Sequence, residues 1–133
     1  MALDRELWAD MVGLPYKDLG RDEKGIDCFG LVMKIYARRG IIVPDIKYGL
    51  TDADRAEALS SPKNLIGWFP CELRPGAVIT FRRNGYVQHC GVCIDDDRFI
   101  HASEDHGCVV IGRLSRNANL HNRMISGTFD YAV

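Results

Sequence analysis

Hydrophobic and polar positions follow a helical spacing in the first part of the chain. Apolar residues recur every three or four positions over residues 3–14 and predict a short amphipathic helix that ends before Pro15. A polar loop follows over residues 17–25. Further along, Thr51 and Asp54 resemble a capping box that opens a second short helix over residues 52–59. The tract over residues 60–72 contains two prolines and is predicted to be irregular.

The segment over residues 26–40 carries both the start and the stop signals of a helix. Asp27 is a good N-cap, basic residues lie in the last turn, and Gly40 can terminate the helix. The apolar stripe includes Leu31 and Val32, and counting back three or four positions from them reaches Cys28. The sequence therefore predicts a thiol at the helix N-terminus, on the face that packs against the rest of the protein.

From residue 77 onward the pattern changes to short strands. Strands are predicted over residues 77–82, 87–94, 98–102, 108–114 and 125–131. Strands this close in sequence pair as antiparallel hairpins, because a parallel crossover needs a dozen or more residues. The expected fold class is α+β, with helices on one antiparallel sheet, and residues 1–133 are expected to form a single domain because no repeat or linker is visible.

The relative position of two histidines depends on the register of the hairpin predicted over residues 87–94 and 98–102. If Asp95, Asp96 and Asp97 form a three-residue turn, Gly91 pairs with His101. His89 and His101 then share one face of the sheet as diagonal neighbours, about 7 to 8 Å apart. A turn shorter or longer by one residue would send them to opposite faces, because side chains alternate along a strand.

These residue types suggest nucleophilic catalysis. The helix dipole and a nearby imidazolium lower the pKa of a thiol, so Cys28 is a candidate nucleophile. His89 would exchange the proton and His101 would orient His89, while unpaired amides of the first helical turn would face an oxyanion. A free cysteine is also a common core residue, and a strand histidine is commonly an ordinary polar side chain. These residues by themselves leave both interpretations open.

The charge balance excludes several other functions. The chain has 17 basic and 18 acidic side chains and no basic tract, which argues against binding nucleic acid or anionic lipid. No segment has the apolar length of a membrane span, and charges stand where a secretory signal would be apolar. We therefore expect synthesis in the cytoplasm without a signal peptide. The five cysteines are odd in number and are expected to be reduced thiols.

A metal site is the main alternative at the level of motifs. Cys90 and Cys93 form a C-x-x-C pattern, and three further candidate ligands besides His89 lie nearby: His101, His106 and Cys108. On a strand, however, Cys90 and Cys93 point to opposite faces. Neither a metal nor a cofactor is therefore expected.

Several motifs together resemble the NlpC-type cell-wall cysteine peptidases. They occur in the order and spacing of that family, over about residues 13–114: Gly13-Leu14-Pro15-Tyr16, Asp27-Cys28-Phe29-Gly30-Leu31-Val32, Leu73-Arg74-Pro75-Gly76, His89-Cys90-Gly91-Val92-Cys93-Ile94 and Phe99-Ile100-His101-Ala102-Ser103. The resemblance implies a circularly permuted papain-like fold. It implies that Cys28 is the nucleophile, His89 the base and His101 the orienting residue. It also implies that Tyr16 lies beside the thiol and contacts the substrate carbonyl.

The resemblance further implies a peptidoglycan stem peptide as substrate, most often cut between D-glutamate and the diamino acid. Phe29 stands where serine commonly follows the cysteine, which looks like the branch found in phage tails and gene-transfer particles. Ala77 replaces a usual acidic residue. This branch implies delivery within a phage-like tail, with tail-tip or baseplate proteins as partners. A non-catalytic structural tail subunit, and an amidase or acyltransferase with the same triad, remain alternatives.

Overall fold

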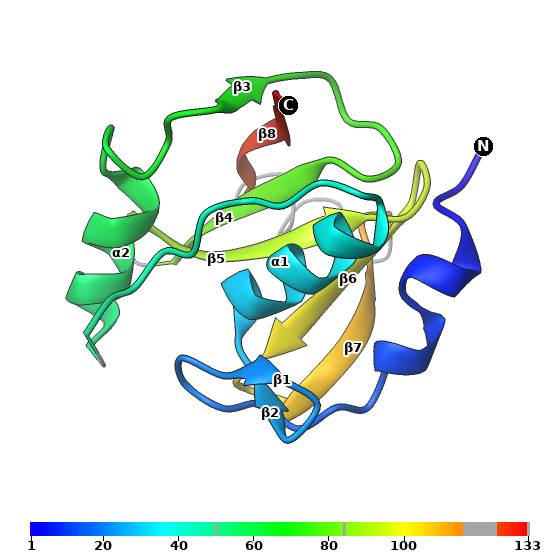
Figure 1. Cartoon of the computed structure of the whole chain (residues 1–133), viewed down its shortest axis with the longest axis horizontal. Helices are drawn as coiled ribbons and strands as arrows, with labels where there is room; N and C mark the ends of the chain where they lie inside the picture. The colour runs from blue at the N-terminus through cyan, green and yellow to red at the C-terminus, as the bar shows by residue number, and fades with distance from the viewer. Residues whose placement is uncertain (50, 84, 116–124, 133) are drawn as a thin grey trace.

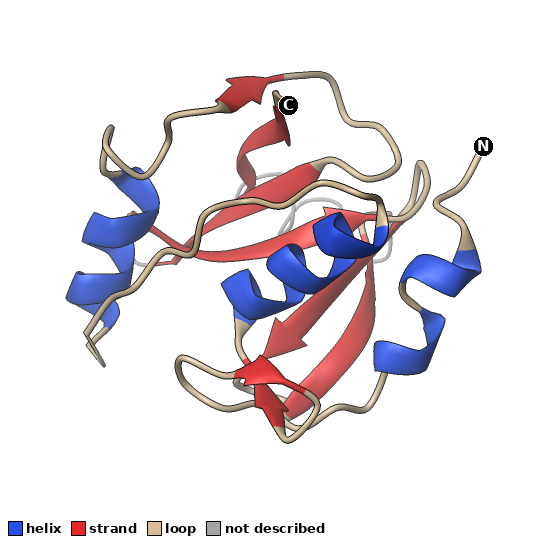
Figure 2. Ribbon diagram, in the orientation of Figure 1, coloured by secondary structure: helices blue, strands red, loops and turns tan. Residues whose placement is uncertain are grey.

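One antiparallel sheet with six strands organises the computed structural model, which describes residues 1–49, 51–83, 85–115 and 125–132. The spatial order is β3-β8-β4-β5-β6-β7. The strands span the following residues: β3 Trp68–Pro70, β4 Val78–Arg83, β5 Tyr86–Cys93, β6 Arg98–Ser103, β7 Cys108–Arg113 and β8 Ile125–Tyr131. Helix α1 (Cys28–Arg38) covers one face of the sheet, and α2 (Asp52–Ser60) lies to its side near β5 (Figures 1 and 2). The predicted α+β class is confirmed.

Helix α1 begins and ends as its sequence predicts. The Asp27 carboxylate accepts a hydrogen bond from the Gly30 amide at 2.8 Å, and Gly40 follows the helix with φ at +84°. The stripe that contains Leu31 and Val32 is fully buried. Because α1 packs on β5 and β6, this stripe fixes the side of the sheet that Cys28 faces.

Helix α2 is held at its start by the predicted cap. The Thr51 hydroxyl accepts from the Asp54 amide at 3.0 Å. Its inner face, which includes Arg55, Ala58 and Leu59, is buried, and the helix packs on β5. In the part of the chain that the structure describes, no helix is long and apolar enough to cross a membrane.

The predicted helix over residues 3–14 is wrong. Two short 3-10 helices, η1 (Arg5–Leu7) and η2 (Ala9–Met11), replace it, and Trp8 interrupts them with a non-helical φ of −144°. The Leu3 amide donates to the Ile94 carbonyl at 2.7 Å, and the Gly13 amide to the Val109 carbonyl at 2.9 Å. These bonds to the neighbouring strands hold both ends of the segment in place of a continuous helical ladder, while its apolar residues remain largely buried.

Two segments that lack a strand pattern nevertheless pair. The predicted loop over residues 17–25 contains a small hairpin, β1 (Arg21–Asp22) with β2 (Gly25–Ile26). Strand β3 lies in the tract predicted to be irregular and pairs with β8 at the sheet edge. These three strands are only two or three residues long, so none of them builds a periodic pattern that a sequence could reveal.

The central hairpin has the predicted register. Val92 pairs with Ile100, and the Ile94 amide donates to the Arg98 carbonyl at 2.8 Å, which closes a three-residue turn. The Asp95 carboxylate organises this turn, because it accepts from the amides of Asp97 and Arg98. Side chains on β5 and β6 therefore alternate as expected between the α1 face and the opposite face of the sheet.

Candidate active site

Cys28 is the first residue of α1, and its side chain faces β5. It is 1% exposed and lies beside the side chains of Cys90 and His89. Interactions with these two side chains, together with the positive charges of His89 and Arg55, hold the pKa of the Cys28 thiol well below its usual range despite burial. The same contact with Cys28, together with burial, raises the pKa of Cys90. Cys28 is therefore the sulfur that ionises within this buried pair.

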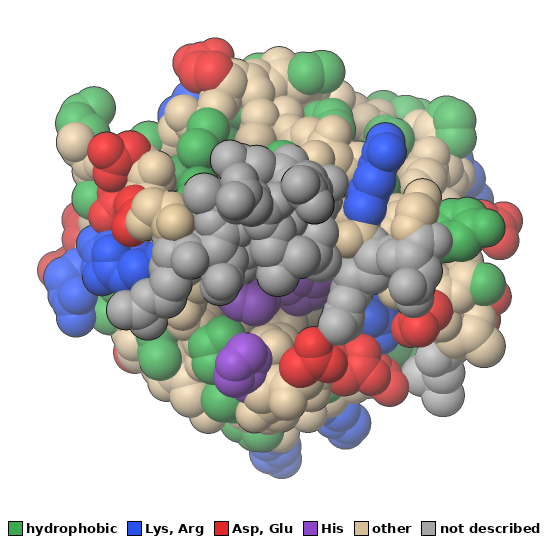
Figure 3. Space-filling model, turned by 180° about the vertical axis from the view of Figure 1, so that it is seen from behind, with side chains coloured by type: hydrophobic (Ala, Val, Ile, Leu, Met, Phe, Trp, Pro, Cys, Tyr) green, Lys and Arg blue, Asp and Glu red, His purple; other side chains and the backbone are tan. Residues whose placement is uncertain are grey.

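His89 and His101 meet as the register requires. His89 Nε2 and His101 Nδ1 are 2.8 Å apart, and the ring centroids are 5.0 Å apart. Because Nε2 of His89 is bound to His101, Nδ1 is the nitrogen left for the Cys28 thiol. Gly91 makes room between the histidines: a Cβ atom there would come within 2.8 Å of the Ile100 carbonyl oxygen. Histidine side chains gather on one face of the molecule in Figure 3.

Two phenylalanines support the histidine rings. The Phe81 ring lies 5.7 Å from that of His89, and the Phe99 ring lies 4.9 Å from that of His101. The two phenylalanines are themselves 5.1 Å apart and buried. Tilted contacts of this kind restrict the motion of both imidazoles, so the histidine pair rests on a fixed apolar base.

Tyr16 reaches the same site from the N-terminal segment. Its amide donates to the Gly107 carbonyl at 2.9 Å, and its hydroxyl contacts Asp18 at 3.1 Å and Arg55 at 3.2 Å. Burial raises the pKa of the Tyr16 phenol, and the negative charge of Cys28 adds to the shift. Tyr16 is therefore a neutral hydroxyl within electrostatic reach of the thiol, and all four predicted site residues lie together.

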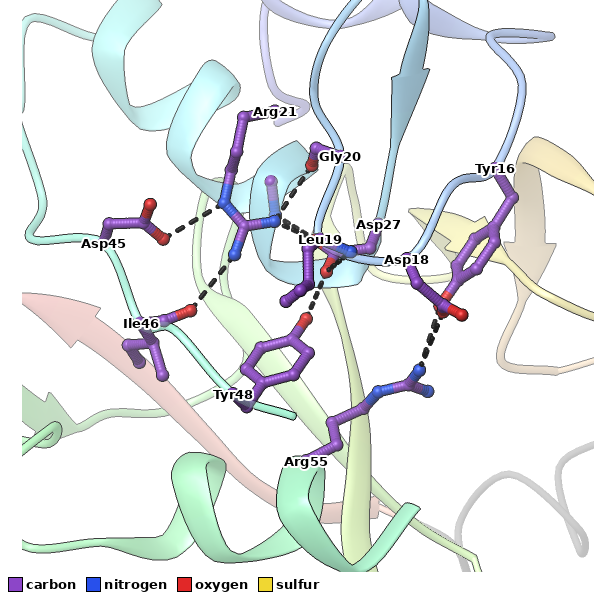
Figure 4. A network of polar contacts seen from close by, with 11 residues as sticks. Tyr16, Asp18, Leu19, Gly20, Arg21, Asp27, Asp45, Ile46, Tyr48 and Arg55 are labelled. Carbon is purple, nitrogen blue, oxygen red and sulfur yellow. Dashed lines mark hydrogen bonds and ion pairs between the residues drawn. The ribbon is translucent and has the colours of Figure 1, made fainter. Parts of the chain in front are cut away.

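Asp27, directly before Cys28, is the centre of a buried polar network (Figure 4). Its carboxylate accepts from the amides of Leu19 and Gly30, from Arg21 at 2.5 Å and from the Tyr48 hydroxyl. Burial and the charge of Cys28 raise the pKa of Asp27, while its donors act in the opposite direction. Since the Gly30 amide is bound to Asp27, it is not available to an oxyanion, which corrects the expectation that the amides of the first turn are all free.

Arg21 connects this network to the segment that follows α1 and contains Asp45 and Ile46. Its guanidinium also binds the Asp45 carboxylate at 3.0 Å and the Ile46 carbonyl at 3.1 Å. The sequence did not predict the contributions of Arg21, Tyr48 and Arg55. Arg21 lies in the segment over residues 17–25, which its sequence marks only as a polar loop.

Replacing Asp27 with alanine is expected to destabilise the fold by about 3 kcal/mol, because it removes a helix cap and leaves the Arg21 guanidinium without its buried partner. Asp45→Ala is the matched control, since Asp45 pairs with the same guanidinium but its side chain is 34% exposed. Its expected cost is below about 1 kcal/mol. Urea unfolding of the two variants measures both values, and equal losses would contradict a special role for Asp27.

The C-x-x-C motif does not form a metal site in the described chain. Cys90 faces Cys28, whereas Cys93 lies in the apolar cluster on the other face and donates its S–H to the Asp95 carbonyl at 3.0 Å. His106 bonds to the Ser103 hydroxyl at 2.8 Å. Among the residues described, no group of three or more His, Cys, Asp or Glu side chains has an arrangement that could hold a metal ion.

Comparison with known proteins identifies the family to which this chain belongs. The family model of the NlpC/P60 family matches residues 13–126, and the chain belongs to that family. The Escherichia coli K12 protein named murein DD-endopeptidase MepS/murein LD-carboxypeptidase is 28% identical over 104 residues, which are 77% of this chain and 50% of MepS. The chain thus spans about half the length of the curated relatives it matches.

Solved structures show the same fold. An NlpC/P60 family protein from Bacillus cereus ATCC 10987 superposes with a TM-score of 0.70 at 22% identity, covering 100% of this chain and 42% of that protein. The NlpC/P60 domain of the peptidoglycan hydrolase SagA has a TM-score of 0.60 at 20% identity, covering 94% of this chain and 93% of that domain. The predicted papain-like NlpC fold is confirmed.

Proposed function

We propose that this protein is a cysteine peptidase that hydrolyses peptide bonds of peptidoglycan. The observation that carries the proposal is the Cys28 thiol at the start of α1, with its pKa lowered by the neighbouring His89, whose ring is bound to His101 at 2.8 Å. Membership of the NlpC/P60 family supports the assignment. The names of MepS and SagA, a murein endopeptidase and a peptidoglycan hydrolase, support peptidoglycan as the substrate.

The proposed reaction has two half-reactions. The Cys28 thiolate attacks the scissile carbonyl, and His89 delivers its proton to the departing amine, which leaves a thioester on Cys28. His89 then takes a proton from water, and the resulting hydroxide attacks the thioester. The product leaves as a carboxylic acid that ionises in water, and the Cys28 thiolate and the protonated His89 are restored. His101 orients the imidazole, and the Tyr16 hydroxyl is placed to contact the carbonyl oxygen. The net change is one water consumed, with one amine and one carboxylate formed.

Digestion of purified peptidoglycan tests the proposal. Sacculi incubated with the protein are expected to release soluble fragments, whose masses show one added water for each bond cut. We propose the bond between D-glutamate and the diamino acid as the site of cleavage, so mass spectrometry should find a new amino terminus on the diamino acid. Sacculi in buffer alone are the control. Fragment release no greater than in that control would overturn the proposed function.

The delivery route that we propose is a phage-like tail, with tail-tip or baseplate proteins as partners. The support is Phe29, the residue after the thiol, which resembles the phage-tail branch of the family. It is 4% exposed and lines an apolar cavity of about 230 Å³ together with Trp68 and Phe129. Detection of the protein in purified particles by mass spectrometry would support this route, and its presence only in the unassembled fraction would contradict it.

A further inference from the structure

Arg55 is a buried cation in the candidate active site. It lies on α2, is 7% exposed, and extends toward Tyr16 and Asp18 (Figure 4). Its charge lowers the pKa of Cys28, and its guanidinium carbon lies 5.9 Å from the centre of the Tyr48 ring. The guanidinium therefore stands among the residues around the thiol, although the reaction described above gives it no role.

The hydrogen bonds of this guanidinium are long and incomplete. One terminal nitrogen, Nη2, contacts the Tyr16 hydroxyl at 3.2 Å and the Asp18 carboxylate at 3.3 Å. The other, Nη1, lies 3.5 Å from the Glu104 carboxylate. Strong charge-assisted bonds are about 2.7 to 2.9 Å long. The third nitrogen, Nε, is buried, and no residue that the structure describes accepts its hydrogen.

The two carboxylates that contact Arg55 can both move away from it. The Asp18 and Glu104 side chains are 42% and 52% exposed, so either carboxylate can turn into water at little cost. Arg55 itself is fixed by burial on α2. If Asp18 turns away, Nε and Nη2 present two parallel N–H groups, which is the arrangement that binds a carboxylate with both oxygens.

We propose that Arg55 binds a free carboxylate of the peptide substrate next to the scissile bond, and that the enzyme thereby selects stem peptides with this carboxylate over those in which it is amidated. The proposal rests on the proposed function. It specifies the chemistry that Arg55 recognises: a γ-linked D-glutamate has a free α-carboxylate, whereas its amidated form offers a neutral carboxamide. A carboxylate satisfies the unpartnered Nε and the charge of the guanidinium, and a carboxamide does not satisfy that charge.

Two synthetic peptides that differ only in this group test the proposal. A hydrogen-bonded charge contributes about 1.5 to 3 kcal/mol, so the wild type should cleave the carboxylate peptide with a kcat/KM about 10- to 100-fold above that of the carboxamide peptide. Arg55→Gln should bring the ratio close to one, and Arg55→Lys should keep part of it. Arg38→Gln, which removes a guanidinium paired with Asp10, is the matched control and should leave the ratio unchanged.

The ratio of the kcat/KM values for the two peptides distinguishes substrate binding by Arg55 from a purely structural role. If Arg55 only positions Tyr16 or favours the thiolate, Arg55→Gln lowers both rates equally and the ratio persists, which overturns the proposal. A wild-type ratio near one also overturns it, even if the variant fails to fold. In both cases peptide cleavage by the wild type leaves the proposed function intact. Failure of the wild type to cleave either peptide, or peptidoglycan, would instead reject the proposed function.

Discussion

Replacing Cys28 with alanine is expected to lower peptidoglycan cleavage by at least about 10⁴-fold, because the sulfur that forms the thioester is lost and burial, which raises the pKa of Cys90, keeps the neighbouring thiol protonated. Alanine occupies less volume, so the buried position tolerates it without a clash. Fragment release from sacculi, followed by mass spectrometry, measures the loss, and circular dichroism of the variant checks that the fold persists.

Cys93→Ala is the control for this result. Cys93 is also buried on β5 but lies on the opposite face of the sheet, where its sulfur contacts the Asp95 carbonyl rather than Cys28. Its replacement should retain most of the activity. Cleavage that persists in Cys28→Ala would reject the thiol mechanism. An inactive wild type with no selective labelling of Cys28 would favour the alternative of a structural tail subunit.

Replacing His89 with alanine is expected to have the second large effect, a loss of about 10⁴-fold in kcat/KM, because the proton acceptor and donor of both half-reactions disappears. The same change should alter the pH dependence of Cys28 itself. In the wild type the pKa of Cys28 is low, so thiolate is present below the pH at which a free cysteine ionises. Without the bond and charge of His89 the pKa rises, and the inflection in the rate of alkylation by iodoacetamide moves to higher pH.

The inflection should remain below that of a free cysteine, because the bond from Cys90 and the charge of Arg55 persist in this variant. His106→Ala is the matched control, since His106 is an exposed histidine bonded to Ser103. It should change neither the turnover nor the inflection. An unchanged inflection in His89→Ala would show that His89 does not act on the thiol.

Local signals were sufficient for the parts of the molecule that place the proposed nucleophile and its histidine pair. The Asp27 cap and Gly40 define α1, and the apolar stripe fixes the face on which Cys28 lies. The three-residue turn fixes the register of β5 and β6, and that register brings His89 and His101 together. Each inference concerns residues within one helix or one hairpin, where spacing and turn length decide geometry.

The tertiary structure decided what depends on contacts between distant segments. The N-terminal segment shows a helical spacing, yet the amides near its two ends donate hydrogen bonds to the carbonyls of Ile94 and Val109. Strand β3 exists because β8 pairs with it, and Asp27 meets Arg21 and Tyr48 only after three segments converge. Such contacts leave no periodic trace in the sequence.

The sequence by itself determined which residues could form a nucleophile and its histidine pair, because local geometry controls them. Only the tertiary structure showed that Cys90 lies against Cys28 and that Arg55 is buried beside Tyr16 with one nitrogen unsatisfied among the described residues. The reason is physical. The pKa of the thiol and the binding capacity of the guanidinium depend on burial and on neighbours from other elements, and these are properties of the packed chain rather than of any segment within it.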